Sequence, residues 1–250
     1  MSTEHNSRLE KLVPNHPAAV TAFAQAKVSL PPAVFNHSFR VFLYAQAFAA
    51  ERLSPEGLRE HPAGISRVCI DDDGESTNED IPLHVLFVAA LMHDFGCAPC
   101  FATTNERFEV TGADAAAAIL RAHRASDAKS DQQESSRVAE RHIRSAWLAI
   151  ALHTSINISE RLDGTVRILR LAVKADFHSD FKPLQRYMAD NLTMADTEAL
   201  LPRLDAEIVL SNAVVAQILQ NPLKAPKASW PADLLRGYEE EPHSTCLARL

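Results

Sequence analysis

The chain has 250 residues, of which 46% are apolar, so it is long enough to bury a substantial core and too apolar to be disordered. Its net charge of −7 and the lack of a basic stripe in the sequence argue against a nucleic-acid-binding surface, because phosphate binding needs a positive face. No signal-like N-terminus, membrane-length apolar run or disulfide framework appears, so we expect a soluble cytoplasmic protein without membrane or nucleic-acid partners.

Helix-forming patterns follow one another along almost the whole chain, and only seven glycines interrupt them. Residues 57–80 contain Pro62, Gly64 and a run of acidic residues, which predicts a solvated loop. No segment shows a confident strand pattern, so the fold class is predicted to be all-α. The predicted helices span residues 18–28, 33–53, 82–94, 112–124, 137–153, 165–177 and 231–240, with two more within 183–220.

Two helix boundaries carry recognisable end signals. Gly96 is expected to end the helix over residues 82–94, because glycine commonly follows a helix C-terminus. Thr111, with Asp114 three residues later, forms a weak capping box and predicts that the next helix begins near Gly112.

The most informative stretch is the apolar run that starts at Leu86 and ends abruptly in His93 and Asp94. Burying an imidazole beside a carboxylate costs free energy unless something pairs with both groups. A divalent metal ion satisfies the two together. This stretch therefore predicts the centre of a metal site.

His37 and Asp176 are the other polar residues that fall on apolar helix faces. His37 shares its face with Val41, Tyr44 and Phe48, at helical spacing, and Asp176 ends the stripe that contains Leu169. Two imidazoles and two carboxylates from three helices can converge on one ion, and such a mixed nitrogen and oxygen set suits zinc, iron or manganese.

The order of His37, His93-Asp94 and Asp176 resembles the signature of the HD-domain metallohydrolase superfamily, which is all-helical. Further segments resemble its cyanamide hydratase-like branch, and the likeness covers roughly residues 33–235. These segments are His37-Ser38-Phe39-Arg40-Val41, Ala90 to Gly96, Arg107 to Ala116, Ala149 to Ser155, Val173 to Phe177, Val214 to Gln217 and Ser229-Trp230-Pro231.

The resemblance implies a metal ligand set and a reaction. His37, His93, Asp94 and Asp176 would be the four protein ligands of one ion, which would be Zn²⁺, with Fe²⁺ or Mn²⁺ as alternatives. The enzyme would be a metal-dependent lyase or hydrolase that adds activated water to a small nitrile-like substrate, converting cyanamide to urea.

The same resemblance and the helix patterns suggest roles for nearby residues. Asp94 and His153 are the two candidates for moving the proton that the nitrile nitrogen must receive. Thr154 and Ser155 are candidates for hydrogen bonds to the substrate amine or the reacting water. Glu109 either orients a ligand histidine, as metal-bound imidazoles usually require, or caps the helix predicted near Gly112.

Two other functions are compatible with the same motif. An HD phosphohydrolase acting on a nucleotide or another phosphorylated metabolite would need further histidines, and His123, His142 and His153 are available by count. Against it, no Arg/Lys cluster near the motifs offers a phosphate clamp. The third alternative is a non-catalytic HD regulatory module, although such modules often lose a ligand.

The resemblance also divides the chain into regions of one domain. Residues 1–32 are expected to be an N-terminal helical extension, residues 33–181 the HD metal-binding core and residues 182–250 the helices that complete it. The alanine-rich helix at 112–124 and the apolar C-terminal helices would serve a homo-oligomer interface as well as they would complete the core. Cys97 and Cys100 lack the second pair of a zinc knuckle and are interpreted as incidental.

Overall fold

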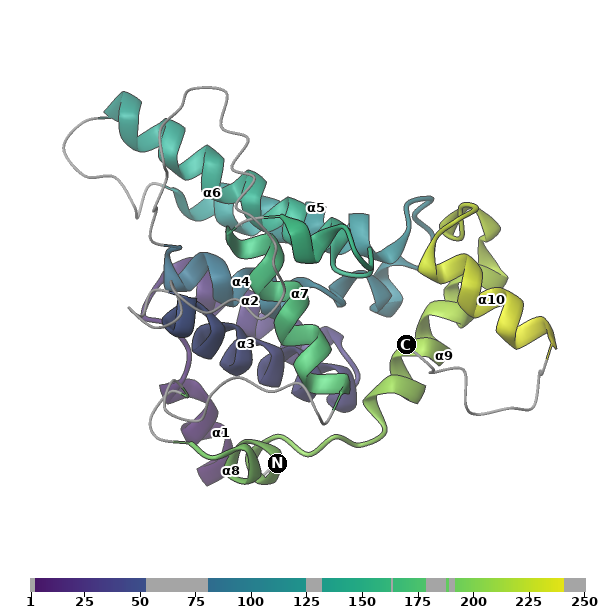
Figure 1. The fold of residues 1–250 in the computed structure, drawn as a ribbon, viewed down its shortest axis with the longest axis horizontal. Helices are drawn as coiled ribbons and strands as arrows, with labels where there is room; N and C mark the ends of the chain where they lie inside the picture. Colours follow the sequence, from purple (N-terminus) through teal and green to yellow (C-terminus); the bar gives the residue numbers. More distant parts are fainter. Residues whose placement is uncertain are drawn as a thin grey trace.

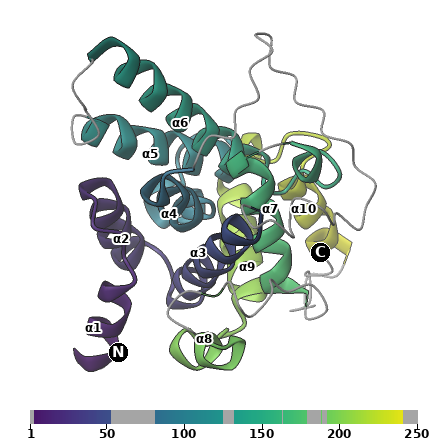
Figure 2. The same cartoon turned by 60° about the vertical axis from the view of Figure 1, so that its left-hand side comes forward.

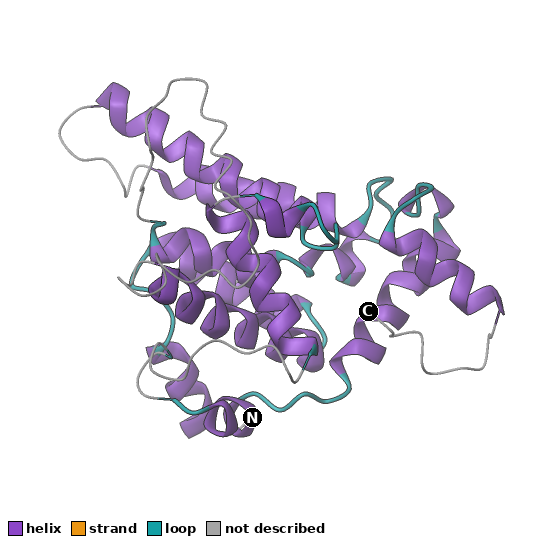
Figure 3. Ribbon diagram, in the orientation of Figure 1, coloured by secondary structure: helices purple, strands orange, loops and turns teal. Residues whose placement is uncertain are grey.

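The structure is a computed structural model that describes residues 3–52, 81–124, 132–162, 164–178, 188 and 192–240. Helices and short turns make up this part of the chain, and no strand occurs in it, which confirms the predicted all-α class (Figure 3). None of the described helices combines the length and the apolar character that crossing a bilayer requires. The predicted loop at residues 57–80 lies outside the described residues.

Each predicted helical segment contains a helix, in the predicted order. One further helix, α1, precedes them. They are α1 (Thr3–Lys11), α2 (Pro17–Ser29), α3 (Pro32–Arg52), α4 (Leu83–Met92), α5 (Phe108–His123), α6 (Gln132–Leu152), α7 (Gly164–Phe177), α8 (Met194–Leu200), α9 (Ala206–Gln220) and α10 (Trp230–Glu240). Within the described residues, the connections contain the 3₁₀ turns η1 (Phe95–Cys97), η2 (Pro99–Phe101), η4 (Ser159–Arg161) and η7 (Pro222–Lys224).

Helix α4 is the centre of the fold. It is apolar on every side, and all residues from Val85 to Met92 are buried, as expected for a helix enclosed by others. Helices α2, α3, α5, α6 and α7 all contact it (Figure 2). One hydrophobic cluster runs from Leu9 in α1 to Leu234 in α10. The C-terminal end of α4 therefore lies in the interior of the protein.

Two helix pairs carry the remaining candidate residues towards the end of α4. Helix α3 packs along α7, and α5 packs along α6 as a hairpin that projects from the body of the molecule (Figure 1). Helices α9 and α10 pack on each other at the opposite end, where α9 also contacts α3 and η1. This arrangement brings His37, Asp176 and His153 to the same region as His93 and Asp94.

The start of α5 differs from the prediction. The helix begins at Phe108, one turn before Gly112, and Arg107 occupies the N-cap position without a side-chain cap. Thr111 is therefore inside the helix, where its hydroxyl lies 3.4 Å from the Arg107 carbonyl oxygen, and the predicted capping box is wrong. The error arose because Phe108, Glu109 and Val110 precede the alanine-rich repeat that marked the helix in the sequence.

Two glycines let α5 approach the turn that follows α4. Helix α4 ends at Met92 rather than at the predicted Asp94, and Gly96 lies in η1. A Cβ atom on Gly96 would be 2.0 Å from the Phe108 carbonyl oxygen, and one on Gly112 would be 2.7 Å from the Met92 carbonyl oxygen. Side chains at these positions would push α5 away from the segment that carries His93 and Asp94.

Candidate metal centre

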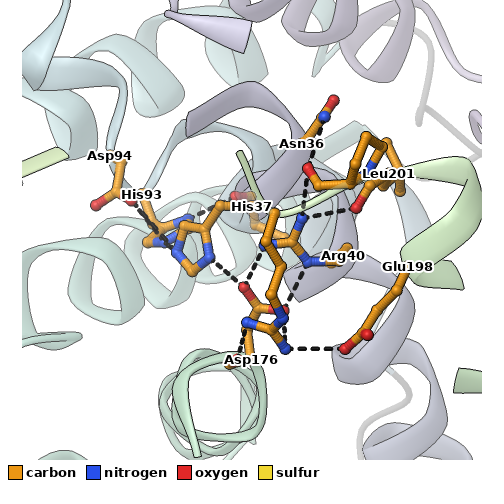
Figure 4. A network of polar contacts seen from close by, with 11 residues as sticks. Asn36, His37, Arg40, His93, Asp94, Asp176, Glu198 and Leu201 are labelled. Carbon is orange, nitrogen blue, oxygen red and sulfur yellow. Dashed lines mark hydrogen bonds and ion pairs between the residues drawn. The ribbon is translucent and has the colours of Figure 1, made fainter. Parts of the chain in front are cut away.

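His37, His93 and Asp94 form one buried group of potential metal ligands. His37 comes from the second turn of α3, and His93 and Asp94 directly follow α4. None of the three is more than 1% exposed. The Nε2 atoms of His37 and His93 are 3.2 Å apart, and the Oδ2 atom of Asp94 lies 3.5 Å from the first and 3.2 Å from the second (Figure 4).

The Nδ1 atom of each neighbouring histidine is already committed to a hydrogen bond. His93 Nδ1 donates to the Ala90 carbonyl oxygen at 2.7 Å, and His153 Nδ1 donates to the Ile150 carbonyl oxygen at 2.6 Å. Both carbonyls belong to the last turn of the helix that the histidine follows, where backbone oxygens lack a helical partner. Since a carbonyl only accepts, each ring carries a proton on Nδ1 and turns Nε2 towards Asp94, with a lone pair on Nε2 when the ring is neutral.

His37 is oriented in a different way. Its Nδ1 donates to Asp176 Oδ2 at 2.7 Å, which leaves Nε2 to face His93. Two neutral rings would thus bring two lone pairs together at 3.2 Å inside the protein. Such an arrangement is favourable only if a proton or a metal ion lies between the two nitrogens.

The charges in the group also favour a proton or a metal ion between the two nitrogens. Burial tends to raise the pKa of Asp94, but His93 and the other imidazoles beside it hold that pKa well below its ordinary value, so the carboxylate is ionised. Burial lowers the pKa of His37. For His93, burial is outweighed by the adjacent Asp94, and the pKa is raised. The group therefore favours one positive charge beside Asp94.

The residues fit a divalent metal ion. Both carboxylate oxygens of Asp94 are buried and accept no hydrogen bond among the described residues, which is costly unless a cation satisfies them. Ligand atoms about 2.0–2.1 Å from a tetrahedral ion lie about 3.3 Å from each other. The three distances in the group match this spacing. Two imidazoles and one carboxylate can hold a metal ion but do not select zinc over iron or manganese.

Asp176 is not where a fourth ligand was predicted. It lies beyond the opposite edge of the His37 ring, and the group of closely spaced ligand atoms does not include it (Figure 4). Arg40 donates to both of its oxygens at 2.7 Å, and the same oxygen that accepts from Arg40 Nη2 also accepts from His37. Burial would raise the pKa of Asp176, but these hydrogen bonds, with that from Arg40 foremost, hold it far below its ordinary value. In the structure Asp176 orients His37.

Arg40 is a functional residue that was not predicted from the sequence. It is wholly buried, and its Nη1 atom also donates to the Leu201 carbonyl oxygen at 2.8 Å. A buried guanidinium needs a carboxylate partner. The signal was its spacing, because a residue three positions after His37 lies on the same helix face. In the sequence, Arg40 was noted only as part of the motif segment that begins at His37.

A small cavity opens beside the metal-ligand group. Its volume is about 50 Å³, and the imidazoles of His37, His93 and His153 and the carboxylate of Asp94 form its polar floor. Phe108, Phe177 and Trp230 form an aromatic wall, with Phe177 stacked on His37 at 4.5 Å between ring centres. Because one water needs about 10–15 Å³, the cavity holds only a molecule of a few atoms.

His153 lies where the prediction placed it, facing the centre from the end of α6. It is 3% exposed, and its Nε2 atom is 3.4 Å from the second oxygen of Asp94, Oδ1. The ring also packs edge-on against Phe108, with 5.7 Å between ring centres. His153 is thus held firmly with one nitrogen in the cavity.

Glu109 takes neither of the two predicted roles. It is fully buried in the first turn of α5, and Arg107 donates to its two oxygens at 3.0 and 2.7 Å. Thr154 Oγ1 donates to Glu109 Oε1 at 2.8 Å, so Glu109 orients Thr154 rather than a histidine. Thr154 lines the cavity, whereas Ser155 does not. The backbone N–H of Ser155 donates to the Leu152 carbonyl oxygen.

Cys97 and Cys100 are free cysteines, one buried and one exposed, and neither joins the metal-ligand group. Burial raises the pKa of the Cys97 thiol well above its ordinary value, which disfavours the thiolate that binds metals.

No protein-family model matches the chain, and no curated protein matches it either. The fold and site therefore define an all-helical protein with a buried group, His37, His93 and Asp94, that can hold a metal ion.

Proposed function

We propose that the protein is a metal-dependent hydratase that adds water to a small nitrile-like substrate, with cyanamide converted to urea as the reaction. The observation that carries this proposal is the triangle of two Nε2 atoms and one carboxylate oxygen that faces a cavity of about 50 Å³. The resemblance of the motif segments to cyanamide hydratase-like HD proteins supports it.

The size and lining of the cavity favour a small, compact substrate. A linear nitrile of a few non-hydrogen atoms matches the available space, whereas a drug-sized ligand needs a pocket of about 300 Å³ or more. The aromatic wall excludes bulk water, so that a single ordered water beside Asp94 becomes the reactant. These features support a hydration of a very small molecule.

The metal ion would be held by His37, His93 and Asp94. When bound, such an ion lowers the pKa of its water towards about 7 and so makes water nucleophilic at neutral pH. The reaction forms one bond between the water oxygen and the nitrile carbon, and both protons of the water end on the nitrile nitrogen. No atom leaves, and no oxidant or reductant is needed.

His153 is placed to move one of these protons. Its Nδ1 proton is fixed by the Ile150 carbonyl, so its Nε2 lone pair accepts a proton from the attacking water and then donates it to the nitrile nitrogen. Asp94 faces the same nitrogen from 3.4 Å and stabilises the imidazolium formed between the two steps. His153 is the catalytic residue in this scheme.

Thr154 is placed to bind the amino group of the substrate. Its hydroxyl proton is donated to Glu109, and Arg107 Nη2 lies 3.2 Å from its oxygen. A hydroxyl oxygen has two lone pairs, so one is left to accept an N–H from a molecule in the cavity. This arrangement favours cyanamide over nitriles without an N–H group.

The test is urea formation by protein loaded separately with Zn²⁺, Fe²⁺ or Mn²⁺. We expect urea from cyanamide with at least one ion, and a loss of about 10²–10⁴-fold in turnover for His153→Ala with its metal content unchanged. Asp94→Asn should lose both metal and activity. Protein that carries a full complement of metal but forms no urea from cyanamide, with any of the three ions, would contradict the proposal.

One observation favours the phosphohydrolase as a second candidate. Arg170 and Lys174 of α7 line the same cavity and are of the type that contacts phosphate. Arg170 donates to Glu160 at 2.8 Å and to the His153 carbonyl oxygen at 3.1 Å, and the remaining N–H groups of its guanidinium are left for a ligand. Phosphate release from a panel of phosphoesters, with two ions per chain, would favour this function, and binding without turnover would favour a regulatory module.

A further inference from the structure

A second candidate binding site lies on the α5–α6 hairpin. Arg137, Arg141 and Arg144 are spaced so that they share one face of α6, and Arg121 of α5 reaches the same place. Together with Trp147 they line a hollow of about 660 Å³, which we call the arginine groove. No basic stripe is visible in the sequence, because the arginines lie on two helices and are separated by other residues.

The positive charge in the arginine groove is only partly neutralised. Arg121 pairs with Glu140 at 2.9 Å, and Asp114 accepts the indole N–H of Trp147 at 2.8 Å, so the groove is lined by four arginines and two carboxylates. Arg137 and Arg144 are exposed and make no ion pair or hydrogen bond with any residue that the structure describes. This excess stands out in a chain whose net charge is −7.

The composition of the arginine groove matches one kind of ligand. Guanidinium groups bind phosphate through two parallel hydrogen bonds, and arginine is preferred to lysine where this geometry matters. All the basic residues that line the groove are arginines. Its volume lies in the range of small-molecule sites, and Trp147 offers an aromatic ring beside the charges. A ligand with several phosphate oxygens would use these features together.

We propose that the arginine groove binds a soluble phosphorylated metabolite, with Arg137 and Arg144 as its phosphate contacts. The groove shares no lining residue with the cavity at the metal-ligand group. It is therefore a separate site, and the proposal stands or falls independently of the hydratase function. Its ligand is a substance other than the small nitrile proposed for the metal centre.

The experiment is a calorimetric titration of the full chain with inorganic pyrophosphate and with ATP at about 150 mM salt, where non-specific attraction between exposed charges is screened. The test variant is Arg137→Gln/Arg144→Gln. The matched control is Arg8→Gln/Arg236→Gln, which removes the same charge from α1 and α10. Thermal unfolding of each variant checks that it is folded, and all four residues are exposed.

We expect saturable binding of at least one probe with a dissociation constant below about 1 mM. The groove variant should bind about 100-fold more weakly, because each of its two substitutions removes a charged hydrogen bond worth about 10-fold in affinity, while the control variant should bind like the natural chain. Absence of saturable binding for both probes would overturn the proposal. So would equal losses in the two variants, or an unchanged affinity in the groove variant.

Discussion

The two sides of the metal-ligand group are built differently. On the side formed by α4 and α6, His93 and His153 are each oriented by a backbone carbonyl three residues earlier, in the last turn of the helix that the histidine follows. On the side formed by α3 and α7, His37 is oriented by the side chain of Asp176, which is 139 positions away, and Asp176 is in turn held by Arg40. The hydrogen bonds that orient the histidines are local on the first side and depend on tertiary packing on the second.

This difference has consequences for stability and for metal binding. A carbonyl at a helix end is present whenever the helix forms, so His93 and His153 need no distant partner. His37 needs a buried ion pair, and both of its members are costly when left alone. We therefore expect substitutions on the α3–α7 side to affect folding and metal affinity, and four experiments test this from the largest expected effect to the smallest.

Replacing Arg40 should have the largest effect on stability. Arg40→Met leaves the Asp176 carboxylate buried without its two hydrogen bonds, and we expect the free energy of unfolding to fall by about 3–5 kcal/mol. Urea denaturation of the metal-free protein measures this. Combining Arg40→Met with Asp176→Leu should cost less than Arg40→Met alone, because the uncompensated charge is removed. An equal or larger loss in the double variant would show that the ion pair is not the cause.

Metal binding should stabilise the folded protein. An ion that binds only the native state adds about 2.7 kcal/mol to the free energy of unfolding when its free concentration is 100 times its dissociation constant. Denaturation with and without Zn²⁺ or Mn²⁺ measures the gain, and Asp94→Asn is the control that should show none. A gain that Asp94→Asn retains would place the ion elsewhere.

Asp176→Asn separates a direct ligand from an orienting residue. If Asp176 acts through His37, as the structure indicates, metal affinity should fall by about 10–100-fold while one ion still binds at saturation. A competition titration with a chelator measures both quantities, and His93→Ala provides the reference for loss of a direct ligand. A loss as large as that of His93→Ala would instead support the direct role that the sequence predicted.

Arg203 offers the smallest effect and a comparison with Arg40. It lies 3.8 Å from Asp176 Oδ1 and pairs with Glu198 at 3.0 Å, but its side chain is 41% exposed. We expect Arg203→Ala to lower the free energy of unfolding by at most about 1 kcal/mol, since exposed ion pairs contribute little. The same denaturation assay checks it. A loss comparable to that of Arg40→Met would mean that burial does not decide the strength of these contacts.

Much of the fold and part of the site could be predicted from the sequence. The helix segments were recognisable because apolar residues recur at helical spacing, and His93, Asp94 and His37 stood out as polar residues on buried faces. The start of α5 was misplaced because its first turn lacks a cap, and its approach to η1 depends on Gly96 and Gly112, whose role is visible only when both helices are in place.

The sequence by itself determined which side chains have metal-binding chemistry, and at the end of α4 also how His93 is oriented, since its hydrogen-bond partner lies only three residues earlier in the chain. The tertiary structure decided that Asp176 supports His37, that Arg40 neutralises Asp176 and that Glu109 holds Thr154. The physical reason is that a carboxylate binds whichever buried donor lies nearest in space, and distance in space between residues of different helices is fixed only by packing.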